Sequence, residues 1–360
     1  MRAAGRLGGP SDFYHDCDHL RPEADAVKTR SFDVVVAGGG PAGVAAAVSA
    51  SRSGARVLLV EREAGLGGNV RAAKVHSICG LYRSAAGPGA EPLQTGLAME
   101  FARRLVASGG ACGPQRFGRL DVLLQEPEAF ARLCEDWVTE AKTIEVMRSA
   151  QVTGGEVEGR RVKSLHLATP AGRVTIEAAA FVEATGDGNL AVAVSLSAAS
   201  APRLELQRPA YIFGLWPVAS AALAPAARLA WSALLVAAVR DGRLGAGALG
   251  AAVRPTCRDG MVRVTLDLAA GGGDYDPCDE GQVRRLTAEA RESAEMLTDF
   301  LRREATGFEK AEGCSWPERI GIRESRRVMG RHVITANEVL SGMVPEDTVC
   351  FSFWPLEWHE

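Results

Sequence analysis

The stretch VVVAGGGPAG, residues 34–43, decides the fold, because it reads as an apolar strand that runs into a G-x-G-x-x-G turn. A helix of small residues follows as far as Gly54, and a second apolar strand, Val57–Val60, ends at the acid Glu61. This order and spacing are typical of a dinucleotide-binding unit. The alternative is a glycine-rich turn that merely connects a strand to a helix. It is disfavoured because strand, turn, helix, second strand and acid all agree.

Each residue type of the turn has a physical role in binding a dinucleotide. Gly38 permits the tight turn, Gly40 lets the backbone approach a pyrophosphate, and Gly43 lets the helix pack closely on the strand. The N-terminus of the helix offers N–H groups and a positive dipole end to the phosphates. Glu61 is placed to accept hydrogen bonds from a ribose diol. Because this acid suits both NAD and the adenosine half of FAD, the fingerprint alone leaves that choice open.

Three further segments resemble known flavoproteins. The polar stretch after Glu61 closes on the pair Gly67-Gly68, as in the FAD-dependent oxidoreductases of the glutathione-reductase-like superfamily. Residues 181–188, FVEATGDG, resemble the strand and Ala-Thr-Gly-Asp element that those flavoproteins place beside the cofactor domain. Residues 320–330 (IGIRESRRVMG) and 354–359 (WPLEWH) resemble a bacterial FAD-dependent oxidoreductase family that includes flavoprotein subunits of heterodisulfide-reductase type. The resemblance spans about residues 31–360.

The resemblance implies FAD as cofactor and an α/β fold. We expect a Rossmann-like FAD/NAD(P)-binding domain, with a parallel sheet and an antiparallel crossover, and a mixed α+β substrate domain. The expected division is a flexible N-terminal extension (1–30), an FAD-binding domain (31–200), a substrate-side domain (201–340) and a return segment toward the cofactor domain (341–360). The implied cofactor-binding residues are Gly38, Gly40, Pro41, Ala42, Gly43, Glu61, Arg62, Gly67, Gly68, Thr185, Gly186 and Asp187.

The chain departs from the family at its C-terminus. Family members end their cofactor domain with another parallel strand, a turn and a helix that contact the ribitol and pyrimidine side of the flavin, whereas this sequence stops at Glu360. We therefore expect a truncated chain in which this last strand and helix are missing. On that expectation the FAD site is formed mainly on its adenosine side, and the polypeptide alone binds flavin poorly.

Apolar spacing predicts the other elements. Helices are expected from about Leu97 to Gly109 and at residues 126–142, 229–240 and 277–304. Short strand-like runs at 143–146, 151–153, 162–167 and 174–176 are expected to form an antiparallel patch that returns to the parallel sheet at 181–184. In the substrate-side domain, strands are expected at 210–215 and 261–268.

Bulk properties argue against several classes of function. The net charge is −3 and acids and bases are interspersed, so the sequence does not indicate a basic patch for nucleic acid or for an anionic membrane. The apolar run 219–239 is interrupted by Pro225 and Arg228, so a core helix is favoured over a membrane span. The eight cysteines show no C-x-x-C spacing, which argues against a zinc or iron–sulfur site. Scattered cysteines, and no signal-peptide pattern, suggest a reducing cytoplasm.

The catalytic candidates lie in the loop after the glycine pair. Disulfide reductases of the superfamily carry a C-x-x-x-x-C pair there, whereas this loop has the single Cys79, so an internal dithiol–flavin relay is not expected. His76 is a candidate proton donor or acceptor, or a covalent flavin anchor. The favoured alternative is a loop histidine whose ring is satisfied by backbone groups. For Cys79, a buried and apolar role is favoured.

A basic cluster near the C-terminus has two interpretations of equal weight. Either Arg323 and Arg326 recognise a carboxylate or phosphate of substrate or cofactor, or the cluster is a salt-bridge network that closes a domain interface. The cluster also contains Arg327 and Arg331, beside Glu324. His359 with Glu357 resembles the Trp-Pro-x-x-x-His element that lines the flavin pocket in the family. No residues are expected to bind a metal.

These observations favour an FAD-dependent oxidoreductase that passes a hydride or electrons between a small organic substrate and a second, unknown acceptor. Two alternatives stay open. One is an NAD(P)-binding dehydrogenase, and the other is a truncated, non-catalytic flavoprotein-like fragment.

Overall fold

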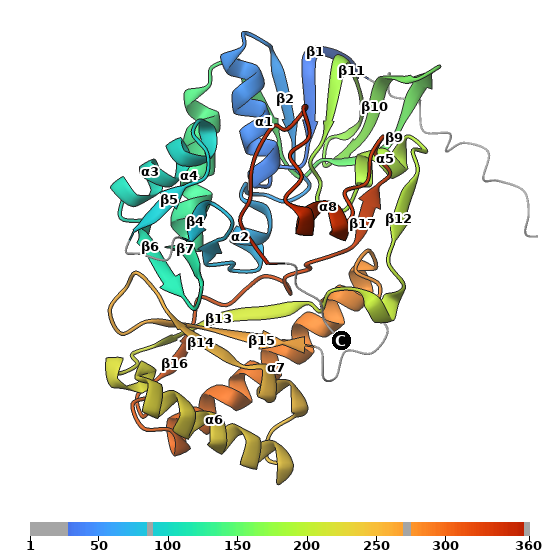
Figure 1. Ribbon diagram of the computed structural model, residues 1–360. Coiled ribbons are helices and arrows are strands. Elements are labelled where there is room, and N and C mark those ends of the chain that lie inside the picture. Colours follow the sequence, from blue (N-terminus) through green and yellow to red (C-terminus); the bar gives the residue numbers. More distant parts are fainter. Residues whose placement is uncertain (1–27, 85–88, 269–274, 356–360) are drawn as a thin grey trace, which may run out of the picture.

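The computed structural model describes residues 28–84, 89–268 and 275–355. Its larger sheet lies beside a second, smaller sheet that has helices of its own (Figure 1). The expected N-terminal extension lies outside the described residues as far as position 27.

The larger sheet has the strand order β8-β2-β1-β11-β10-β9. The first four strands of this order run parallel, and β10 and β9 follow antiparallel along the β11 edge. The parallel part, with a helix directly after β1, confirms the predicted Rossmann-like α/β fold. The bounds are β1 (Lys28–Ala37), β2 (Val57–Val60), β8 (Ile144–Met147), β9 (Gln151–Glu158), β10 (Arg161–Thr169) and β11 (Gly172–Glu183).

Strand β2 and the C-terminal end of β1 are buried on both faces. Val36 and Leu59 pack into one hydrophobic cluster, whereas their neighbours Val35 and Leu58 pack into another on the opposite face. Strands buried on both faces read as continuous apolar runs, which is why the sequence pattern identified them.

Helices cover both faces of this sheet. Apolar residues of α1, α3 and α4 share the core of Val36, and α5 packs on the core of Val35. Figure 1 shows α1, α3 and α4 on the same side of the sheet. The bounds are α1 (Pro41–Arg52), α2 (Gly68–Ala72), α3 (Leu97–Ala107), α4 (Pro127–Glu140) and α5 (Asn189–Ala193).

The second core is built on an antiparallel sheet of order β14-β15-β13-β16, which packs against α6 and α7. Its elements are β13 (Ala210–Trp216), α6 (Pro225–Arg240), β14 (Ala252–Pro255), β15 (Val262–Asp267), α7 (Glu280–Glu304) and β16 (Glu312–Cys314), with short 3-10 turns at Arg203–Glu205, Ser220–Leu223 and Ala246–Gly250. The remaining elements are β3 (Ser77–Ile78), β4 (Tyr82–Ser84), β5 (Ala90–Pro92), β6 (Ala111–Phe117), β7 (Leu120–Gln125), β12 (Ala198–Ser200), β17 (Arg326–Val328) and α8 (Ala336–Ser341).

The expected antiparallel patch is wrong in two respects. Residues 144–147 form β8, a parallel edge strand, because they pair with β2. The strands expected separately at 174–176 and 181–184 are one strand, β11, which stays paired with β1 from Val174 to Glu183. Residues 151–158 and 161–169 do pair antiparallel, as expected, but they extend the larger sheet.

Two helices start at positions other than those expected. Helix α6 begins at Pro225, because proline fits the first turn of a helix, where no N–H partner is needed. Helix α7 begins at Glu280, because the carboxylate of Asp279 accepts hydrogen bonds from the N–H groups of Gly281 and Gln282 and so caps the helix there.

Two of the cysteines form a disulfide. Cys112 of β6 is bonded to Cys257, which follows β14, with the Cα atoms 5.4 Å apart. The partners are separated by 145 positions, and a pairing of that kind cannot be read from local cysteine spacing. The cysteine pattern therefore does not support the expected cytoplasmic location, which stays a prediction.

Candidate functional site

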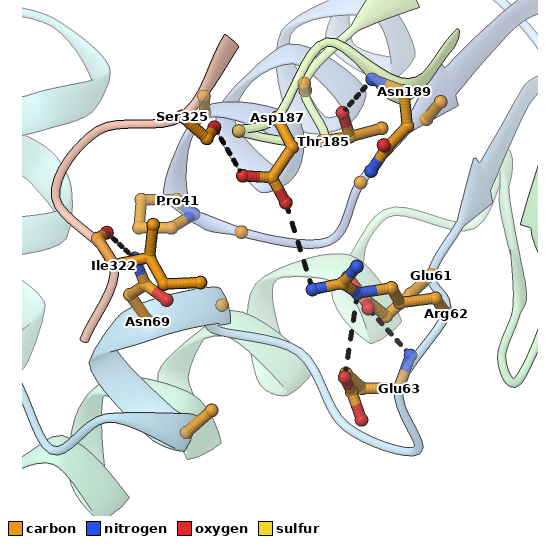
Figure 2. A pocket seen from close by; sticks show the side chains of 18 of the residues that line it. Pro41, Glu61, Arg62, Glu63, Asn69, Thr185, Asp187, Asn189, Ile322 and Ser325 are labelled. Atoms are coloured by element: carbon orange, nitrogen blue, oxygen red, sulfur yellow. Dashed lines mark hydrogen bonds and ion pairs between the residues drawn. The ribbon is translucent and has the colours of Figure 1, made fainter. Parts of the chain in front are cut away.

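A cavity of about 370 Å³ lies where β1, β2 and β11 end. Ligands of open α/β sheets bind at this edge, outside the carboxyl ends of the strands. Figure 2 shows the side chains that line it. All of the predicted cofactor residues except Gly43 and Gly67 line this cavity, together with part of the segment that connects β16 to β17.

The glycines of the fingerprint turn differ in what surrounds them. A Cβ at Gly38 would lie 2.2 Å from the carbonyl oxygen of Ala184, and one at Gly43 would lie 1.7 Å from the carbonyl oxygen of Gly38. These two glycines are therefore required by the packing of the chain itself. A Cβ at Gly40 would meet only the Cα of Gly68, at 3.8 Å, so the space in front of Gly40 is not filled by protein.

Glu61 is fixed at the end of β2 by backbone N–H groups. Its side chain is buried, with Oε2 accepting from Gly39 N at 2.6 Å and Oε1 accepting from Glu63 N at 2.8 Å. A carboxylate oxygen has two lone pairs, so both oxygens keep acceptor capacity for a ligand hydroxyl. The carboxylate lines the cavity in a position set by the turn.

The Thr-Gly-Asp element after β11 is held by side chains from distant parts of the sequence. Figure 2 shows Asp187 between Ser325 and Arg62: Oδ1 accepts from Ser325 Oγ at 2.7 Å, and Oδ2 lies 3.9 Å from Arg62 Nη2. Thr185 Oγ1 accepts from the backbone N–H of Asn189 at 2.9 Å. The segment that was expected only to resemble a family motif thus contributes Ser325 to this cavity.

The glycine pair packs directly on the fingerprint turn. The N–H of Gly67 donates to the carbonyl oxygen of Gly39 at 2.9 Å. Gly68 has φ +52, and a Cβ there would lie 3.0 Å from the Cα of Gly40. This close backbone approach places Gly68 at the cavity wall beside Gly40.

Arg319 is a site residue that the sequence reasoning missed. Its Nη2 donates to Asn69 Oδ1 at 3.3 Å, and its Nε has no hydrogen-bond partner among the described residues. Burial lowers the pKa of this guanidinium, and the positive charge of Arg62 lowers it further. The cavity wall thus holds a half-buried cation beside a second cation and beside the carboxylates of Glu61, Glu63 and Asp187. Guanidinium groups of this kind can pair with a ligand anion. No motif or spacing in the sequence marks Arg319.

The predicted basic cluster does not act as one unit. Arg323 is exposed and lines the cavity. Arg326 does not line the cavity, and its Nη2 donates to Asn189 Oδ1 at 2.5 Å. Arg327 pairs with Glu324. The ligand role of Arg323 stays a prediction, whereas Arg326 and Arg327 are bonded to groups of the protein itself. His359 and Glu357, expected to line the flavin pocket, lie outside the described residues.

His76 and Cys79 lie outside the lining of this cavity. Cys79 is exposed, so the expected buried role is wrong. His76 is buried, and neither ring nitrogen has a hydrogen-bond partner among the described residues, so the expectation of a ring satisfied by backbone groups is also wrong. Burial, with the nearby charges of Arg263 and Arg254, lowers the pKa of His76 to about 3.

We expect His76 to make the fold sensitive to acid. An unfolded histidine has a pKa of about 6.5, so between pH 6.5 and 3 the unfolded chain binds a proton that folded His76 does not. Stability from this group is therefore complete above pH 6.5 and declines as the pH falls toward 3. Between pH 7.5 and 5 the wild type should lose about 2 kcal/mol more than His76→Gln. Urea unfolding across this range measures the difference, and parallel curves for the two proteins would contradict the expectation.

Two kinds of feature are absent from residues 28–84, 89–268 and 275–355. In that part of the chain, no helix is long and apolar enough to cross a membrane. No three His, Cys, Asp or Glu side chains there are grouped so that they could hold a metal ion.

The chain is similar to known flavoproteins. A family model described as FAD dependent oxidoreductase matches residues 33–360. Sarcosine oxidase subunit alpha of Corynebacterium sp. (strain P-1) is 58% identical over 81 residues, which are 22% of this chain and only 7% of that protein.

Two solved structures illustrate the structural similarity. The p-nitrophenol 4-monooxygenase PnpA from Pseudomonas putida DLL-E4 aligns with a TM-score of 0.48 and 14% identity, covering 84% of this chain and 70% of that one. A geranylgeranyl bacteriochlorophyll reductase-like protein from Thermoplasma acidophilum aligns with a TM-score of 0.47 and 16% identity, covering 81% and 66%.

Proposed function

We propose that this chain, which belongs to the FAD dependent oxidoreductase family, passes a hydride or electrons between a small organic substrate and a second acceptor. Family membership makes it a flavin oxidoreductase with FAD as its cofactor. The hydride step, the substrate and the acceptor are the proposed part.

The open space in front of Gly40 is the observation that carries the proposal. The chain's own atoms fill the space beside Gly38, Gly39 and Gly43, where an added Cβ would approach other atoms to 2.5 Å or less. Of the four glycines of the turn, only Gly40 faces room that protein leaves free, and it does so at the start of α1, where the helix dipole favours a phosphate. The residues present therefore fit the pyrophosphate of a dinucleotide.

The chain's side chains supply binding and orientation. The Glu61 carboxylate is placed to accept from the ribose, and Arg319 is placed to donate to the pyrophosphate. Ser325 and Arg62 hold Asp187 at the cavity wall. When bound, FAD supplies a two-electron redox centre, so the protein has to position the substrate and to exclude competing reactions.

We infer that residues 201–340 form the substrate-side unit and residues 31–200 the cofactor unit. In support, a wider cavity of about 700 Å³ adjoins the cofactor cavity and reaches α7 of the second core. The two cavities share Arg62, Asp187 and Arg319, so there is room for a second molecule beside a bound dinucleotide.

A visible absorption spectrum of the purified chain, with acid release and identification of the cofactor, tests the proposal. We expect flavin absorption bands and release of FAD. Titration with added FAD then measures the affinity, and tight stoichiometric binding would contradict the expectation that the polypeptide alone binds flavin poorly. A colourless chain that binds NADH would favour the dehydrogenase alternative. A folded chain that takes up neither would favour the non-catalytic fragment.

A further inference from the structure

A second cavity, of about 400 Å³, lies within the core that covers one face of the larger sheet. It is lined by α1, α3, α4 and β3 and opens to solvent on one side, with the rings of Phe101, Phe130 and Trp137 among its walls. Its lining is exposed at Pro41, Cys79 and Ala98, which mark its mouth. Because Pro41 also lines the cofactor cavity, the mouth lies beside the proposed FAD site.

None of the fifteen residues that line this second cavity carries a charged side chain. Gln125 is its most polar buried group, at 2% exposure. Its Nε2 donates to the carbonyl oxygen of Val75 at 3.2 Å, but its Oε1 has no hydrogen-bond partner in the described part of the chain. A buried acceptor without a donor costs about 1–3 kcal/mol, so such an atom in a cavity wall calls for a ligand donor.

We propose that this cavity binds an uncharged aromatic molecule bearing one hydroxyl or ring N–H group that donates to Gln125 Oε1, and that this molecule is the substrate. The assignment as substrate rests on the proposed function, because it takes the adjoining cavity to be the FAD site. Binding of the aromatic molecule itself does not depend on it.

The chemistry of the wall selects this class of ligand. The volume lies within the range of about 300–1,000 Å³ that is typical of small-molecule sites. Aromatic walls favour a ring through offset or edge contacts. A carboxylate or ammonium group would be buried here with no counter-charge in the lining, at a large desolvation cost. Charged amino-acid-like substrates are therefore disfavoured in this cavity.

Binding of 2-naphthol, followed by its own fluorescence with FAD present at saturation, tests the proposal. We expect saturable binding, with 2-naphthoate at least about tenfold weaker because it is charged. In Ala98→Trp the indole should block the mouth of the cavity and weaken the binding of 2-naphthol at least about tenfold. Val106→Trp is the matched control, since it places the same side chain at an exposed position of α3 outside the lining, and it should bind as the wild type does.

The Gln125→Met variant tests the proposed hydrogen bond between the ligand and Gln125 Oε1, and it leaves the mouth of the cavity unchanged. It should weaken the binding of 2-naphthol about tenfold and leave the binding of naphthalene, which lacks a hydrogen-bond donor, unchanged. Equal binding by Ala98→Trp and Val106→Trp, or equal binding of 2-naphthol and 2-naphthoate, would overturn the proposal. Competition between 2-naphthol and FAD would also overturn it, by assigning the cavity to the ring of the cofactor.

The same variants separate this inference from the proposed function. FAD uptake, measured by absorption, should be unchanged in Ala98→Trp and in Gln125→Met. Binding of 2-naphthol by a chain that takes up no FAD would support the aromatic site and count against the proposed function. FAD uptake without any 2-naphthol binding would leave the proposed function standing and overturn the aromatic site.

Discussion

Replacing Gly40 by alanine should weaken FAD binding at least ~100-fold while leaving the fold intact. The added Cβ meets only the Cα of Gly68, at an ordinary contact distance of 3.8 Å, and the backbone at this position has φ −71, which alanine adopts freely. The same Cβ would stand where the pyrophosphate must approach the turn. A hundredfold loss corresponds to about 2.7 kcal/mol. Titration with FAD measures the affinity, and urea unfolding measures the fold.

Alanine substitutions at two other glycines serve as controls. Gly43→Ala should destabilise the chain itself, because its Cβ would lie 1.7 Å from the carbonyl oxygen of Gly38. Gly113→Ala, in β6, meets nothing within 4 Å and should change neither stability nor FAD affinity. Unchanged FAD affinity in folded Gly40→Ala would mean that the fingerprint serves only as a turn, and the proposed site would then be wrong.

The first βαβ unit was predictable because its signals are local. The apolar runs that became β1 and β2, the glycine turn and the acid all lie within residues 34–61, and each constrains its neighbours through a few bonds. The partner with which a strand pairs could not be predicted in this way. The run at 143–146 has the composition of a strand in either direction, and only its contact with β2 makes it parallel. Strand composition indicates that a strand exists, not which strand it pairs with.

The site was predictable only where its residues belong to one of these local patterns. Gly40 and Glu61 are part of the fingerprint, and Asp187 is part of a recognisable element after a strand. Arg319 reaches the site through a hydrogen bond to Asn69, 250 positions away. Ser325 meets Asp187 across 138 positions. Such contacts depend on how the second core docks, and no local spacing records that.

The same limit applies to the polar groups buried between the two cores. Sequence reasoning singled out His76 but attached no role to Glu126 or Arg263. In the structure, Arg263 of β15 is 1% exposed and reaches Glu126 at the start of α4, across 137 positions. Its charge is one of the causes that keep His76 neutral. Burial is the main cause of the low pKa of His76, and the charge that the docking of the cores brings near it lowers that pKa further.

Replacing Arg263 by methionine should destabilise the chain by about 3–5 kcal/mol, the cost of removing one partner of a buried ion pair. Its Nη1 donates to Ser315 Oγ at 2.7 Å, and its Nη2 lies 3.3 Å from Glu126 Oε2. Without the guanidinium, the buried Glu126 carboxylate keeps its desolvation penalty and loses the charge that offset it. Urea unfolding at neutral pH measures the loss.

The double variant Arg263→Met/Glu126→Met distinguishes this explanation from simple loss of packing. Replacing both members of a buried pair by apolar side chains of similar size is often neutral or stabilising, because both desolvation penalties disappear. The double variant should therefore recover most of the stability that Arg263→Met loses, although Glu126→Met alone should also be destabilising. Glu126 precedes α4 without capping it through its side chain, so its replacement does not cost the helix a cap. If the double variant is as unstable as the sum of the two single variants, the pair is not coupled, and the core-to-core contact owes its stability to packing rather than to charge.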